Sequence, residues 1–263
     1  EQQAAALGSR VELKRHDFEV MVPVTSSAVL EIPAAGEVKI YPFWPAGVRL
    51  NATAPEGIRG RLVYAADGKI EQIRPKDVDG QIAVIESTAS ANWQQLAYFG
   101  AKAIIVLGGD SVNNADLRTH DTVIPFNLPR FFLPDGEFAD TLRKGAITSE
   151  VVLRASANWE KKTAHNYYVL IHPREQVDGP NPAEMLSVPY DAGGLVPDLA
   201  YSASQAVQTA AGLALMREFA ENPIRRPVVI FFSGADSIHM LGTRQMFMAF
   251  ADVPPMWNNE LAT

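Results

Sequence analysis

The second half of the chain reads Met185-Leu186-Ser187-Val188-Pro189-Tyr190-Asp191 and later Val228-Val229-Ile230-Phe231-Phe232-Ser233-Gly234-Ala235-Asp236. Each stretch is an apolar run that ends in a carboxylate. Residues 204–221 lie between them and carry small apolar side chains at helical spacing. The pattern predicts a strand, a helix and a second strand of an open α/β sheet. Since functional sites of such sheets lie outside the carboxyl ends of the strands, Asp191 and Asp236 are the first candidates for a site.

The composition is that of a globular protein with a sizeable core. The chain has 263 residues, of which 47% are apolar, and its net charge is −7. This acidic balance argues against nucleic acid or an anionic membrane as a partner. Because the chain has no cysteine, disulfides and thiolate metal sites are excluded. We find no apolar run that approaches the roughly 18 residues of a membrane-spanning helix.

The two runs resemble the core of the di-zinc aminopeptidases and of their glutamate-carboxypeptidase and transferrin-receptor relatives. In that family His-x-Asp closes the first strand, a bridging Asp follows in a loop, and Gly-Ala-Glu-Glu closes the second strand before Leu-Leu-Gly-Ser. Here residues 188–191 match the first motif, residues 234–237 read Gly-Ala-Asp-Ser, and residues 240–243 read Met-Leu-Gly-Thr. The resemblance implies a three-layer α/β/α domain. It also implies that Asp236 holds the general-base position and that Asp191 holds the supporting position that orients a metal ligand.

The same motifs lack the metal ligands of the family. Pro189 stands where the metal-binding His belongs, Ser237 replaces a ligand Glu, and the bridging Asp falls near Val207 or Gln208. Proline and valine have no donor atom for zinc, and serine is a poor ligand beside His, Cys or a carboxylate. A pair of metal ions roughly 3.5–4 Å apart also needs a bridging anion. We therefore expect a non-catalytic homologue without a metal cofactor, which acts as a binding or interaction module for a protein or peptide ligand.

Each candidate residue also has a structural interpretation, which we favour. Asp191 could cap a backbone turn at the end of its strand, and Asp236 could cap the segment that leads to Met240. In the alternative, Asp236 and His239 share one face of a helical turn and form a remodelled site with Asp191 and Asp198. That alternative function is a zinc metallopeptidase, aminopeptidase-like, whose metal site is completed by residues beyond this chain.

Three regions are expected along the chain. Residues 1–45 are predicted to be a lead-in segment of the peptidase-like domain, with a turn at Ser26-Ser27 between two strands. Residues 46–155 resemble a protease-associated domain in the order of their turns, strands and helices, and residues 124–126 begin the Ile-Pro…Gly…Leu…Gly end of that pattern. Residues 156–263 are predicted to be the N-terminal part of the α/β domain, after a polar connector at residues 159–164.

The resemblance has two further implications. More sheet follows in the family after the Leu-Leu-Gly-Ser motif, so we expect this chain to be a fragment of a longer peptidase-like protein. Members of the family also lead us to expect a place outside the cytoplasm, in the periplasm, as a secreted protein or as the ectodomain of a membrane protein.

Overall fold

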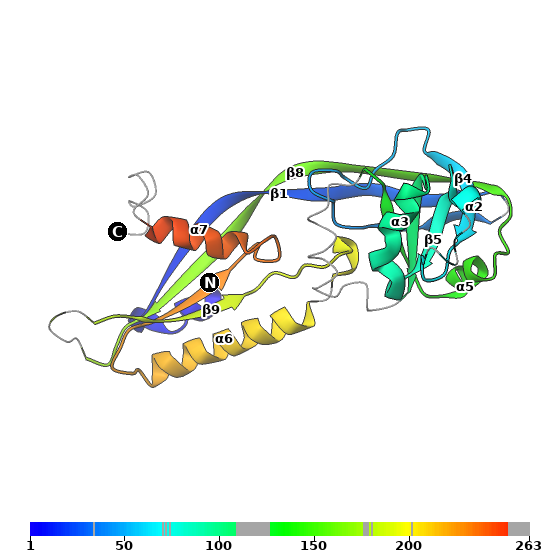
Figure 1. Ribbon diagram of the computed structural model, residues 1–263. Coiled ribbons are helices and arrows are strands. Elements are labelled where there is room, and N and C mark those ends of the chain that lie inside the picture. Colours follow the sequence, from blue (N-terminus) through cyan, green and yellow to red (C-terminus); the bar gives the residue numbers. More distant parts are fainter. Residues whose placement is uncertain are drawn as a thin grey trace. The chain divides into compact units, whose positions relative to one another are not determined.

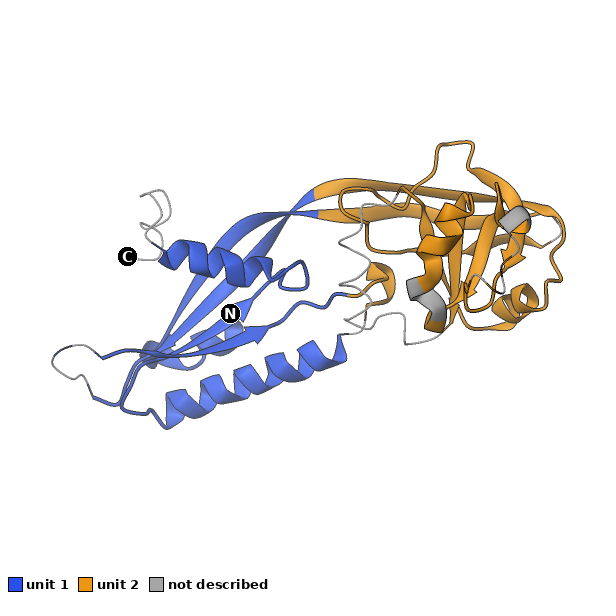
Figure 2. Ribbon diagram, in the orientation of Figure 1, with its two compact units in different colours: residues 1–21, 161–193, 201–263 blue, residues 22–160, 194–200 orange. Residues whose placement is uncertain are grey.

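A computed structural model of the chain describes residues 1–251 except residues 34, 70, 72, 74, 109–126, 176–178, 180 and 201. The chain folds into two compact units (Figure 2). Unit 1 comprises residues 1–21, 161–193 and 201–263, and unit 2 comprises residues 22–160 and 194–200. Two long strands, β1 (Val11–Ile32) and β8 (Glu150–Ile171), contribute residues to both units.

Unit 1 contains a mixed sheet in the order β1, β8, β10, β9. Strand β10 (Val228–Ser233) runs antiparallel to β8, with Phe231 opposite Tyr168. It runs parallel to β9 (Glu184–Pro189), with Ser233 opposite Pro189. Because β9 and β10 are parallel neighbours, their carboxyl ends lie at the same edge of the sheet.

Helices cover both faces of this sheet, as Figure 1 shows for α6 (Ala203–Glu221) and α7 (Leu241–Phe250). The alternation of side chains along β10 explains the layers. Ile230 and Phe232 pack in one apolar cluster with Met216 of α6, and Phe231 packs in another with Met246 of α7. The short helix α1 (Gln2–Ala5) adds Ala4 to the cluster on the α6 side. The predicted three-layer α/β fold is confirmed.

Unit 2 is built on a sheet in the order β2, β1, β8, β4, β5, β6, β7, β3. Strands β4 to β7 are parallel to one another. Helix α5 packs in the apolar cluster on one face, and α3 in the cluster on the other. The elements are β2 (Gly36–Lys39), β3 (Tyr41–Pro42), β4 (Ile58–Tyr64), β5 (Ile82–Glu86), α3 (Trp93–Tyr98), β6 (Ala103–Gly108), β7 (Arg130–Pro134) and α5 (Glu137–Arg143). The shorter helices of unit 2 are α2 (Pro75–Val78), η3 (Ser87–Asn92) and η5 (Pro197–Leu199), and unit 1 contains the short helix η1 (Gly8–Arg10).

Two local predictions are wrong. The chain does not turn at Ser26-Ser27, because these residues continue β1, and residues 159–164 are not a connector but the middle of β8. A β-strand is stabilised by backbone hydrogen bonds to its neighbours, so it can continue through polar residues where both faces of the sheet are exposed to solvent. The Ser26 hydroxyl donates to the Ser156 carbonyl at 3.1 Å, which ties the two strands together. Residues 124–126, which begin the Ile-Pro…Gly…Leu…Gly end of the expected pattern, lie outside the described residues, and the protease-associated assignment of residues 46–155 stays a prediction.

Candidate functional site

Asp191 lies just beyond the end of β9 and accepts hydrogen bonds from the loop that follows β10. Its Oδ1 accepts the backbone N–H of Asp236, and its Oδ2 accepts the backbone N–H of Ser237, both at 2.9 Å. These two bonds join the ends of neighbouring parallel strands. Both carboxylate oxygens of Asp191 are therefore engaged by the protein's own backbone.

The Asp236 carboxylate is likewise engaged, by side chains and backbone on either side of its turn. Its Oδ1 accepts the backbone N–H of Thr243 at 2.8 Å, and its Oδ2 accepts the Thr243 hydroxyl at 2.7 Å. The Ser233 hydroxyl donates to the same Oδ2. Thr243 lies in the first turn of α7, where backbone N–H groups have no partner within the helix. Asp236 thus caps α7 from outside, since Met240, the residue at the N-cap position, provides no side-chain bond.

His239 and Asp198 do not join these two carboxylates in a described cluster. Residues 236–240 form a turn rather than a helix, and His239 is exposed there in the left-handed region, at φ 52°. The condition for a shared helical face with Asp236 is therefore not met. Asp198 is exposed on η5 and belongs to unit 2. Over the described residues, no group of three or more His, Asp or Glu side chains is arranged to hold a metal ion.

Asn166 of β8 binds the loop that follows β10, a role that was not predicted from the sequence. It is fully buried, accepts the backbone N–H of Gly234 at 3.1 Å and donates to the Gly242 carbonyl at 2.9 Å. The backbones at the two glycines are in direct contact. A Cβ on Gly242 would lie 2.1 Å from the Gly234 carbonyl oxygen. A Cβ on Gly234 would in turn lie 2.4 Å from the His165 carbonyl oxygen, so close backbone packing explains the glycine at both positions.

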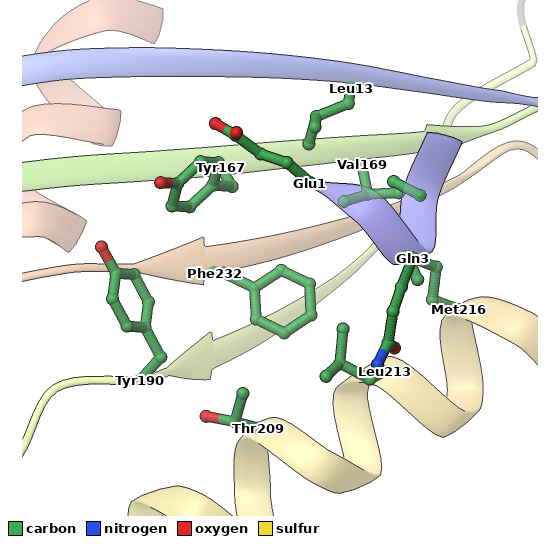
Figure 3. A pocket seen from close by; sticks show the side chains of 11 residues that line it. Glu1, Gln3, Leu13, Tyr167, Val169, Tyr190, Thr209, Leu213, Met216 and Phe232 are labelled. Carbon is green, nitrogen blue, oxygen red and sulfur yellow. The ribbon is translucent and has the colours of Figure 1, made fainter. Parts of the chain in front are cut away.

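Tyr190, between Pro189 and Asp191, is fixed by a hydrogen bond to β8. Its hydroxyl donates to the His165 carbonyl at 2.7 Å. Burial, and then the nearby Tyr167 and Asp191, raise the pKa of Tyr190 to about 12. The phenol is therefore a neutral donor at any physiological pH. Tyr190 also borders a pocket beneath α6, shown in Figure 3.

No protein-family model matches this sequence, and no curated protein matches it either. Solved structures do. A zinc aminopeptidase from Bacillus subtilis matches with a TM-score of 0.64 and 17% identity over 96% of this chain. A peptidase M28 precursor from Shewanella amazonensis matches with a TM-score of 0.58 and 14% identity over 94%. An aminopeptidase from Aneurinibacillus sp. strain AM-1 matches with a TM-score of 0.54 and 20% identity over 97%.

The fold is that of the zinc aminopeptidases. This chain spans 57%, 59% and 60% of the lengths of the Bacillus, Aneurinibacillus and Shewanella structures, respectively. Within the described part of the chain, no helix is long and apolar enough to cross a membrane.

The residues at the edge of β9 and β10 do not fit the zinc that this fold holds in the Bacillus enzyme. Zinc is bound by His, Cys or carboxylate donors with free lone pairs directed at one point. Pro189 has no donor, and the oxygens of Asp191 and Asp236 are directed at N–H and O–H groups of the protein. Each Asp191 oxygen and Oδ1 of Asp236 keep one lone pair beside these bonds, but within the described residues no third His, Asp or Glu side chain joins the two carboxylates to complete a zinc site.

Proposed function

We propose that this chain is a non-catalytic form of the zinc-aminopeptidase fold and serves as a binding module for a protein or peptide. The single observation that carries the proposal is the engagement of both carboxylates by the protein's own donors. Asp191 accepts two backbone N–H groups at 2.9 Å, and Asp236 accepts the Thr243 N–H and hydroxyl at 2.8 and 2.7 Å. With the bond from the Ser233 hydroxyl, these contacts use both lone pairs of Asp236 Oδ2 and one lone pair of Oδ1, which favours a capping role over that of a general base.

The arrangement supports a structural role for each carboxylate. A carboxylate that accepts backbone N–H groups at the end of a strand, or in the first turn of a helix, satisfies donors that would otherwise lose their partners on burial. The motif residues Asp191, Asp236 and Gly242 therefore maintain the shape of this edge without metal. A scaffold kept in this way can still present surfaces and pockets to a ligand. We further propose that the protein acts outside the cytoplasm, in line with the resemblance of its motifs.

Metal content and hydrolysis test the proposal together. The protein, in the longest form that its gene encodes, is purified without chelator and its zinc content is measured by inductively coupled plasma mass spectrometry. Turnover is measured on a panel of aminoacyl p-nitroanilides and acidic dipeptides, with and without added zinc. We expect zinc far below one ion per chain, and no hydrolysis that depends on Asp236.

The control is the variant Asp236→Ala, prepared in parallel. Stoichiometric zinc in the parent protein, together with turnover that this variant loses, would overturn the proposal. That result would instead identify a metallopeptidase whose site is rebuilt around Asp191 and Asp236 with residues beyond this chain.

A further inference from the structure

The pocket beneath α6 is an apolar space of about 180 Å³ that lies wholly within unit 1. Figure 3 shows the rings of Tyr167 and Tyr190 at one end and Met216 at the other, with Phe232 of β10 between them. Helix α6 closes the pocket with Thr209, Leu213 and Met216. The lining is therefore dominated by aromatic and aliphatic side chains that come from the sheet and from one long helix.

The walls of the pocket are held in place by contacts outside it. The Tyr190 hydroxyl is anchored to the His165 carbonyl at 2.7 Å, so its ring cannot turn inward without losing that bond. Phe232 is pressed against α6 at Gly212, where an added Cβ would lie 3.0 Å from the ring. The helix approaches the sheet at this glycine, and the pocket opens beside it. A pocket with fixed walls is not filled by relaxation of its own side chains.

The chemistry of the lining selects an uncharged, flat guest. Glu1 is the one charged side chain among the lining residues, and its carboxylate already lies 3.6 Å from the Arg15 guanidinium. The Tyr167 and Tyr190 rings are 6.0 Å apart and tilted by 53°. Tilted rings of this kind can receive a third ring edge-to-face or offset-stacked. Apolar pockets are poorly hydrated, so an apolar guest that enters them displaces little bound water.

We propose that this pocket binds an uncharged aromatic group of one or two fused rings. Its volume is below the roughly 300–1,000 Å³ of pockets that enclose drug-sized ligands, which limits the guest to a group of about the size of indole. The same chemistry is offered by a free small aromatic molecule and by a Trp or Phe side chain of a peptide. The inference goes beyond the loss of the metal site and does not depend on it.

Binding is tested on the full chain in the presence of a chelator, so that a result on zinc cannot affect it. The probes are indole, for the free molecule, and N-acetyl-tryptophanamide, for the peptide side chain. Saturation-transfer NMR measures binding, and intermolecular NOEs identify the protein rings in contact with the probe. We expect at least one probe to bind and to show NOEs to Tyr167, Tyr190 or Phe232. Binding of one probe alone identifies the source of the ring.

Two adjacent positions of α6 provide a matched pair of variants. Thr209→Phe places a ring inside the pocket, whereas Ala210→Phe adds the same ring on the exposed side of the helix. We expect the first variant to weaken binding about tenfold or more, which corresponds to 1.4 kcal/mol, and the second to bind as the parent does. Absence of binding to the parent chain, equal binding to both variants, or NOEs confined to residues outside the pocket would overturn the proposal. The NOE map of the parent keeps the test decisive if Thr209→Phe does not fold.

Discussion

The substitution Asp191→Asn distinguishes a structural carboxylate from a catalytic one. Both partners of Asp191 are backbone N–H groups, those of Asp236 and Ser237, at 2.9 Å. An asparagine side chain has one oxygen and one amino group, so it can accept only one of these bonds. Its amino group must then lie against the other backbone N–H, and two donors cannot form a hydrogen bond with each other. Asp236→Asn differs, because the hydroxyls of Thr243 and Ser233 can reverse their bonds and accept from an amide.

The expected magnitudes follow from these partners. Hydrogen bonds to a charged group contribute about 1.5–3 kcal/mol each, and a buried donor without a partner costs about 1–3 kcal/mol. Since Asp191 and its partners are half-buried, we expect Asp191→Asn to lower the free energy of unfolding by about 2–3 kcal/mol. Asp236→Asn keeps a partner for every group and loses only the charge, so we expect a loss of about 1 kcal/mol.

Urea unfolding followed by circular dichroism measures the stability of each variant. Hydrogen–deuterium exchange of the peptides that cover residues 184–193 and 228–243 locates the effect. Asp198→Asn is the control, because Asp198 is exposed on η5, and its stability should stay within about 0.5 kcal/mol of the parent. The reasoning is refuted if Asp191→Asn is as stable as this control, or if Asp236→Asn is the more damaging of the two.

Two further predictions concern close packing and charge. Gly242→Ala should destabilise unit 1 by roughly 3 kcal/mol or more, because its Cβ would lie 2.1 Å from the Gly234 carbonyl oxygen, and thermal unfolding that stays unchanged would contradict this. In unit 2, the hydrogen bonds from Arg143 and then from Tyr64 lower the pKa of Glu86 below its ordinary value of 4.5. The Arg143–Glu86 ion pair therefore stabilises the fold fully above pH 4.5, and this stabilisation is lost as the pH falls through the lowered pKa of Glu86 in the folded state. Arg143→Met should therefore lower the free energy of unfolding by about 1–2 kcal/mol at pH 7, and the stability of this variant should fall less steeply than that of the parent between pH 5 and pH 3. Urea unfolding of both proteins at pH 7, 5 and 3 measures these differences.

Local patterns in the sequence were sufficient for the elements around the candidate site. The strand predicted at residues 227–232, the helix at 204–221 and the strand at 184–188 form, with small shifts of their ends, as β10, α6 and β9. Apolar alternation and helical spacing are properties of residues that are close in sequence, so they predict a strand or a helix wherever the fold buries the apolar face. The position of a carboxylate after each strand follows from the same local pattern.

The sequence by itself therefore indicated an open α/β sheet with two carboxylates at one edge, and its resemblance to the di-zinc aminopeptidases implied that Pro189 stands at the position of a metal-binding His. It also favoured capping roles for both carboxylates, but only the tertiary structure identified the donors that they accept. Asp236 is directed at Thr243, and Asn166 reaches Gly234 and Gly242 from 68 and 76 residues away. The direction of a side chain depends on which donors the fold places near it, and donors so distant in sequence leave no local pattern. For the same reason β8 continues through its polar residues 159–164, since its partners lie on other strands.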